Sequence, residues 1–236
     1  MAAVSWSNHG YEPQSKLRKH IQKQASEYYT LRFAGLFNLP IPLRFAFGIG
    51  VSTIMLELAA HILDIAENSV RAGARLIEID IDEDTAKDTL SIEIIDDGQG
   101  MKQEEIKKVL DPFYTTKTVR RVGLGLPLLA DASQRSGGSL QLESEKGKGT
   151  TVKATFVLSH VDRQPMGNIV STLIILIAGN SDVDFFYKYR HNDRQFKLDT
   201  REIRKEIMDV PINHPEILKY IRGVLEEGFS EIKPEA

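Results

Sequence analysis

Four short motifs in a fixed order between residues 63 and 151 constrain this sequence more than any other feature. Each motif alone is a weak signal, because acid–glycine and glycine–threonine pairs are common in ordinary turns. Their order and spacing constrain both the fold of this stretch and the ligand that it can hold. The motifs are Asp64-Ile-Ala-Glu-Asn68-Ser, Asp96-Asp-Gly98-Gln-Gly100, Gly123-Leu-Gly125-Leu and Gly147-Lys-Gly149-Thr150-Thr.

The hydrophobic pattern around the motifs predicts a regular order of helices and strands. Apolar residues at helical spacing predict a helix over 55–72, which Gly73 ends. The whole order predicts an α/β fold, a two-layer sandwich of a mixed sheet with helices on one face. The other expected elements are strands over 76–81, 90–95, 139–144 and 151–158, helices over 103–110 and 123–136, and a polar loop over 111–122.

After a short linker at 162–165, the pattern predicts a small α+β C-terminal appendage. A nearly all-apolar helix over 169–178 precedes a hairpin of strands at 183–190 and 195–198. Two closing helices are predicted from capping boxes, the pairs Asp199 with Glu202 and Asn213 with Glu216. We therefore expect three parts, residues 1–54, 55–160 and 161–236.

The first part differs from the rest in charge. Residues 1–53 hold six Lys and Arg against two acids, in a chain of formal net charge −3. Pro40, Pro42 and Arg44 interrupt the apolar run over 33–56, so we expect no stable membrane insertion. Met55 opens the first strongly periodic helix pattern. We therefore expect the fold to begin near Met55, and residues 1–54 to be a basic head that need not belong to it.

Composition excludes several classes of function. The chain has no cysteine, so it holds no disulfide and no thiolate metal site, which suits the cytoplasm. A pI near 6.1 gives no bulk basic field, so we expect no nucleic-acid partner.

The Asp96 motif can recognise a flat ring. A carboxylate at the end of a strand accepts a hydrogen bond, which the amino group of adenine can donate and the oxygen of guanine cannot. Gly98 and Gly100 allow the backbone to approach such a ring closely. An ordinary Asp-Gly turn is the alternative explanation.

The first motif offers oxygen ligands from one helix face. Asp64 and Asn68 are four residues apart, so their side chains project from the same side. An Asn oxygen suits a magnesium ion that phosphates and water already bind, and an acid one turn earlier can polarise a water. The alternative is a solvated polar stripe, to which Glu67 would also belong.

The last two motifs can contact phosphate and support Asp96. Gly123-Leu-Gly125 before a helix presents free N–H groups at a positive helix end. Lys117, with Thr115 and Thr116, could add a cation there. Gly149-Thr150 at a turn is common hairpin chemistry, and in its functional version the Thr150 hydroxyl would bridge to Asp96.

The motifs together resemble the GHKL superfamily of ATP-binding domains, the Bergerat fold shared by gyrase, the ninety-kilodalton heat-shock chaperone, histidine kinases and the mismatch-repair protein MutL. Glu67-Asn68-Ser69 followed by Ala72-Gly73-Ala74 is similar to the MutL form. Asp111-Pro-Phe113-Tyr-Thr-Thr-Lys117 and Gly147-Lys-Gly149-Thr150 resemble the histidine-kinase form. The resemblance covers about residues 55–158.

The resemblance implies ATP and Mg²⁺ as cofactors, with Asn68 as the metal ligand. Asp64 stands where MutL and the chaperone carry a water-activating Glu, one methylene longer, so Asp64 and Glu67 are the candidate catalytic residues and fast hydrolysis is not implied. Arg121 replaces a glycine that often opens the lid. The implied cofactor-binding residues are Asn68, Asp96, Gly98, Gly100, Met101, Phe113, Thr116, Lys117, Gly123, Leu124, Gly125, Leu126 and Thr150.

Two functions remain open on the sequence. We favour a cytoplasmic, slow Mg-dependent ATPase or nucleotide-gated regulator, acting with a protein partner or as a homodimer. The alternative is a protein kinase, anti-sigma-like or histidine kinase-like, that phosphorylates a separate partner. His9 and His20 lie in a proline-broken segment, so we do not expect autophosphorylation. His61 lies within the first helix, where we expect it either to pack or to support a neighbouring site residue.

Overall fold

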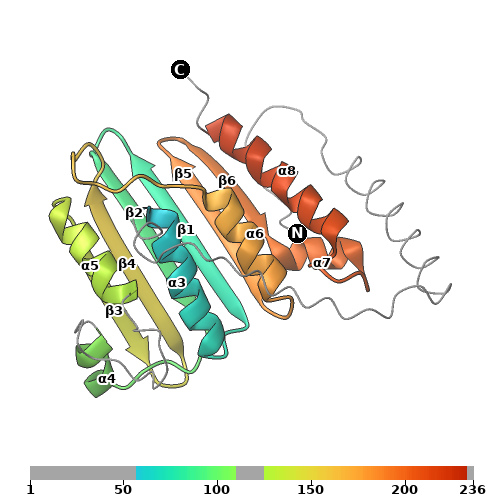
Figure 1. The fold of residues 1–236 in the computed structure, drawn as a ribbon, viewed down its shortest axis with the longest axis horizontal. Helices are drawn as coiled ribbons and strands as arrows, with labels where there is room; N and C mark the ends of the chain where they lie inside the picture. Colours follow the sequence, from blue (N-terminus) through green and yellow to red (C-terminus); the bar gives the residue numbers. More distant parts are fainter. Residues whose placement is uncertain (1–56, 110–124, 233–236) are drawn as a thin grey trace, which may run out of the picture.

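The computed structural model describes residues 57–109 and 125–232 of the chain (Figure 1). Expectations for residues 1–56 and 110–124, including the head and the polar loop, lie outside the described residues. The elements are α3 (Leu58–Arg71), β1 (Leu76–Asp84), β2 (Thr89–Asp96), α4 (Gln103–Val109), α5 (Gly125–Arg135), β3 (Ser139–Glu145), β4 (Gly149–Val157), α6 (Ile169–Gly179), β5 (Asp184–His191), β6 (Arg194–Asp199), α7 (Thr200–Ile207) and α8 (Pro215–Ile232).

The strands form one six-stranded sheet in the order β3-β4-β2-β1-β5-β6. Neighbouring strands are antiparallel except β1 and β5, which are parallel. In Figure 1, α5, α3, α6 and α8 lie across one face of this sheet. The predicted mixed sheet with helices on one face is confirmed.

The core forms because every second residue of the central strands is apolar. Ile77, Ile79 and Ile81 of β1 are buried, as are Leu58 and Ile62 of α3. The half-exposed residues between them carry charges, and two of these residues, Asp80 and Asp82, pair with Lys188 and Arg190 of the parallel strand β5. The sheet therefore has one apolar, helix-covered face and one charged face.

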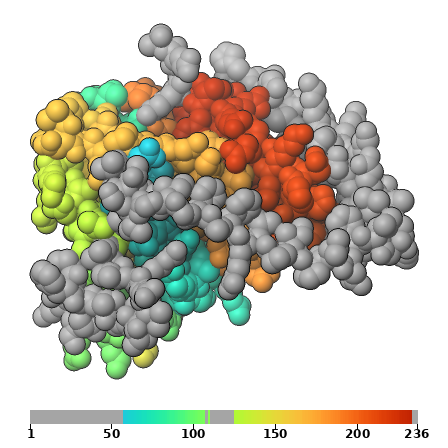
Figure 2. Space-filling model, in the orientation of Figure 1, coloured from blue at the N-terminus to red at the C-terminus, as the bar shows by residue number. Residues whose placement is uncertain are grey.

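The C-terminal region contains the predicted α+β elements, but they extend the first sheet. Strand β5 pairs with β1 over eight residues, from Leu76 with Asp184 to Glu83 with His191. Phe185, Tyr187 and Tyr189 are buried in the same hydrophobic cluster as α3. Figure 2 shows α6 and α8 side by side on the helix-covered face. The region after residue 161 therefore shares both sheet and core with the motif-bearing part.

One of the two predicted helix caps lies at a different residue in the structure, and Glu202 of the other predicted box pairs with Lys205 at 2.7 Å. Asp199 caps α7, accepting a hydrogen bond from the Arg201 N–H at 2.9 Å. Helix α8, however, begins at Pro215, and the Nδ1 atom of His214 accepts from the Glu216 N–H at 3.4 Å. Proline is favoured at the first helical position, which moves the cap from Asn213 to His214.

Among residues 57–109 and 125–232, no helix combines the length and apolar character that crossing a membrane requires. The apolar helix α6 has only 11 residues.

Gly228 should be required for the close packing of α8 on β6. A Cβ at this position would overlap the ring of the buried Phe196, whereas a Cβ at Gly223 of the same helix would meet open space. We expect Gly228→Ala to lower the free energy of unfolding by about 1–3 kcal/mol. Gly223→Ala should raise it by up to about 1 kcal/mol, because alanine favours helix. Urea unfolding measures both, and equal effects would contradict this packing.

Candidate nucleotide site

The candidate site is centred on Asp96, the last residue of β2. The residue is 7% exposed, and both of its carboxylate oxygens accept hydrogen bonds. The Ser69 hydroxyl of α3 donates to Oδ2 at 2.6 Å, and the Gly98 N–H donates to Oδ1 at 2.9 Å. Buried polar groups need such partners. The carboxylate is therefore held between a helix and the turn that follows its own strand.

Glycines allow the surrounding backbone to come close to Asp96. Gly149 has a φ of +104°, and a Cβ there would overlap the backbone oxygen of Asp96. Gly100 has a φ of +59°, and a Cβ there would overlap the carbonyl of Glu145. The β3–β4 turn therefore packs directly against the turn after β2.

Thr150 and Met101 meet at Ser144. Thr150 lies opposite Asp96 in the β2–β4 register, but its hydroxyl lies 2.9 Å from the Ser144 Oγ. The Met101 N–H donates to the same Ser144 Oγ at 2.8 Å. The hydroxyl that reaches the Asp96 carboxylate thus belongs to Ser69, while Thr150 contributes the neighbouring backbone.

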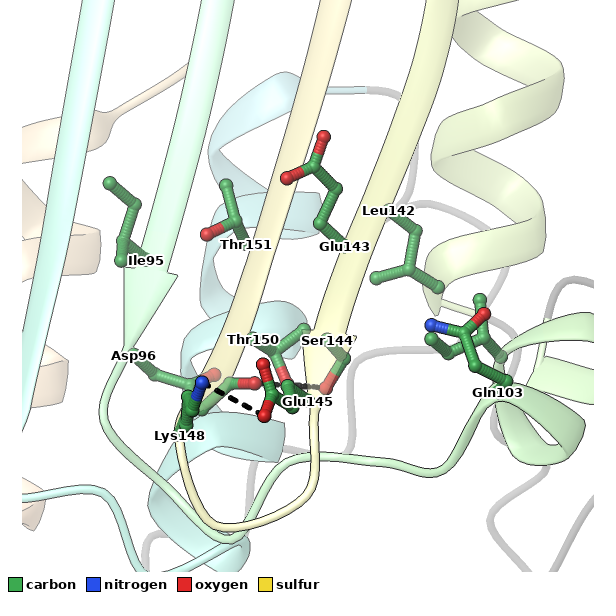
Figure 3. Close-up of a pocket in the computed structure, with 12 residues that line it drawn as sticks. Ile95, Asp96, Gln103, Leu142, Glu143, Ser144, Glu145, Lys148, Thr150 and Thr151 are labelled. Atoms are coloured by element: carbon green, nitrogen blue, oxygen red, sulfur yellow. Dashed lines mark hydrogen bonds and ion pairs between the residues drawn. The ribbon is translucent and has the colours of Figure 1, made fainter.

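A hollow of about 720 Å³ adjoins this end of the sheet (Figure 3). Asp96, Ser144 and Thr150 line it together with Gln103 and Ile106 of α4. The lining also includes Ile95, Leu142, Glu143, Glu145, Lys148, Gly149 and Thr151. The volume falls within the range of small-molecule sites.

Helix α3, which carries Ser69, also carries a second group of polar side chains, and these lie outside the lining of the hollow. The Asn68 Nδ2 donates to the Asp64 Oδ2 at 3.3 Å, as the four-residue spacing predicts. Arg71 donates to the Asn68 Oδ1 at 2.6 Å and forms an ion pair with Glu67 at 3.5 Å. Asp64, Asn68, Arg71 and Glu67 therefore form one connected network.

Helix α5 begins directly against this network. A Cβ on Gly125, its first residue, would overlap the Asp64 carboxylate. A carboxylate at a helix amino end is stabilised by the helix dipole. Leu126 is partly buried against the core. Phe113, Thr116, Lys117, Gly123 and Leu124 lie outside the described residues.

The Asp64 and Asn68 side chains on α3 fit a magnesium ion whose other ligands are phosphate and water. Asn68 and Asp64 supply hard oxygen atoms, but the described residues contain no group of three acids or histidines that could hold a metal. Magnesium usually keeps phosphate and water ligands, so few protein oxygens suffice. Arg71 occupies the Asn68 oxygen, and a cation would have to share or displace this contact.

Sequence reasoning did not assign a role to Ser69 or Arg71. Ser69 directly follows Asn68, but its hydroxyl could equally have bonded its own helix. Arg71 lies three residues after Asn68, a spacing that does place side chains on one face. That spacing was the available signal for Arg71.

Comparison with known proteins identifies the domain that carries this geometry. Residues 50–160 match the family model described as "Histidine kinase-, DNA gyrase B-, and HSP90-like ATPase". Residues 50–160 therefore match an ATPase domain of the GHKL superfamily, and the similarity of the chain to curated proteins is of the histidine kinase type.

The relatives are much longer than the matched region. Sporulation kinase C of Bacillus subtilis is 31% identical over 102 residues, 43% of this chain and 24% of that protein. Sensor histidine kinase WalK of the same organism is 33% identical over 101 residues, 41% of this chain and 16% of that protein. The N-terminal domain of a DNA repair protein aligns in structure with a TM-score of 0.43 and 16% identity, over 66% of this chain and 57% of that one.

His61 lies in α3 one turn before Asp64 and packs into the core, as expected. It is 1% exposed, and its Nε2 lies 3.0 Å from the Gln164 Oε1. Burial lowers the pKa of its imidazole below the ordinary 6.5, against the opposing effects of Gln164 and Asp64. The folded protein therefore holds this ring neutral where an unfolded chain would protonate it.

Protonation of His61 in the unfolded chain should make stability depend on pH. As pH falls below about 6.5, the unfolded state binds a proton that the folded state does not, so the free energy of unfolding falls. In His61→Gln, the part of this fall in the free energy of unfolding that comes from His61 should be absent. Urea unfolding at pH 7.5, 6.5 and 5.5 measures the difference between the two proteins, and parallel pH profiles would contradict this assignment.

Proposed function

We propose that this chain is a cytoplasmic ATP-binding protein that works as a slow Mg-dependent ATPase or nucleotide-gated regulator. The observation that carries the proposal is the buried Asp96 carboxylate, which both Ser69 and Gly98 orient beside a hollow at the end of the sheet. The family of the domain supports ATP as the ligand.

In the proposed complex, Asp96 accepts a hydrogen bond from the adenine amino group. Asn68 would hold Mg²⁺, which would neutralise phosphate charge, and Asp64 would orient the attacking water. Gly98, Gly100 and Met101 shape the ring pocket, and the amino end of α5 at Gly125 faces phosphate. Asp64 has a shorter reach than a Glu, which supports slow turnover.

Phosphorylation of a partner protein is the second candidate. The similarity to Sporulation kinase C and WalK favours it, although the chain matches a quarter or less of either kinase. A protein partner or a second copy of the chain would complete either function. The lack of cysteine supports the cytoplasmic location.

Substitution of Asp96 should separate nucleotide recognition from folding. Asp96→Asn presents an amide that can turn a donor towards the ring, so we expect Mg·ATP to bind about 10- to 100-fold more weakly by calorimetric titration. Asp97→Asn is the matched control, because Asp97 Oδ1 accepts from the Arg75 and Leu76 N–H groups instead. Unchanged affinity in Asp96→Asn would remove Asp96 from the adenine site.

An assay with γ-labelled ATP distinguishes hydrolysis of ATP from transfer of its terminal phosphate to a partner protein. The purified chain with magnesium should release phosphate slowly, and Asp64→Asn should bind ATP yet release phosphate about 100-fold more slowly, because a general base is lost. Label on a protein added from a lysate would instead establish the kinase function. If Asp64→Asn hydrolyses ATP at the parent rate, Asp64 is not the base and Glu67 takes its place as candidate.

A further inference from the structure

We propose that Ser69 is the positioning residue that sets the base preference of the site, by fixing Asp96 as a hydrogen-bond acceptor. The inference rests on the proposed ATP-binding function and adds a residue that determines specificity. Ser69 and Asp96 are 4% and 7% exposed, so water is a poor substitute for either partner.

The distances decide the direction of the hydrogen bond. The Ser69 Oγ lies 2.6 Å from the Asp96 Oδ2 but 3.3 Å from the Ile65 carbonyl oxygen of its own helix. Hydroxyl hydrogen bonds are usually 2.5–3.0 Å long, so the single hydroxyl proton belongs to the Asp96 contact.

Both oxygens of Asp96 therefore receive a donor from the protein. The Gly98 N–H donates to Oδ1 and the Ser69 hydroxyl donates to Oδ2, so the protein holds both oxygens in place as acceptors. An ionised carboxylate has no proton to donate but keeps unused lone pairs. It can accept from a 6-amino purine, whereas it repels the oxygen of a 6-oxo purine.

Without Ser69, the preference of the site for a 6-amino purine should weaken. In Ser69→Ala, Oδ2 loses its buried donor, so the carboxylate can rotate away from the orientation that presents an acceptor to the ring. A 6-amino purine then loses the hydrogen bond that its amino group donates, whereas a 6-oxo purine made no such bond. Loss of Ser69 should thus harm binding of ATP more than binding of inosine triphosphate, which differs at position 6 of the base.

The test compares the affinities of Mg·ATP and Mg·inosine triphosphate for the full chain. We expect the parent to prefer ATP, and Ser69→Ala to reduce the preference by about 5- to 20-fold, mostly by weakening ATP. The ratio within one variant does not depend on the fraction of folded protein. Ser133→Ala is the matched control, because Ser133 is a buried helical serine whose hydroxyl donates to the Ala130 carbonyl.

The outcomes distinguish this inference from the function on which it rests. A parent that binds neither nucleotide overturns the proposed function, and the inference with it. A parent that prefers ATP, with the same ratio in Ser69→Ala, overturns the role of Ser69 alone. If Ser133→Ala changes the ratio of the two affinities as much as Ser69→Ala does, the effect is one of general packing. That result would also overturn the role of Ser69.

Discussion

The hydrogen bond from Ser69 to Asp96 joins the two elements on which the candidate site depends, helix α3 and the end of strand β2. Asp64, Asn68 and Ser69 all lie on the single helix α3. Fixing Ser69 against β2 therefore also fixes the distance from Asp96 to the oxygen atoms at Asp64 and Asn68. One contact thus relates the expected base-binding group to the expected phosphate-binding groups.

The C-terminal region supports the same helix from its other end. The first N–H groups of α3, at Leu58 and Ala59, donate to the carbonyls of Pro165 and Met166 at 2.9 and 2.8 Å. The Asn168 cap of α6 follows directly, and α6 packs beside α3. A helix amino end requires such partners for its free N–H groups. The segment after β4 is consequently part of the structure that positions the site.

Much of the fold could be predicted from the sequence because periodicity reports burial directly. Alternation in β1 and β2 and helical spacing in α3 each depend on one buried face, which residue type reveals. The pairing of β5 with β1 is different, because two strands 100 residues apart carry no local signal of their register. The predicted appendage therefore turned out to extend the sheet.

The candidate site was predictable to a similar extent. The glycine turns and the acids have short sequence signatures, and the structure brings Asp64, Asn68, Asp96 and Gly125 into one region. The direction of a hydroxyl is not encoded in sequence, so Ser69 was missed and Thr150 was expected in its place. Both are hydroxyl residues within the motifs, and only the packing of α3 against β2 shows which of them reaches the Asp96 carboxylate.

The most direct measurement is a crystal structure of the chain with magnesium and a non-hydrolysable ATP analogue. The account predicts the adenine amino group within hydrogen-bonding distance of an Asp96 oxygen, with the Ser69 contact retained and the metal bound to the Asn68 oxygen in place of Arg71. A nucleotide bound elsewhere, or an adenine ring whose amino group faces away from Asp96, would contradict it.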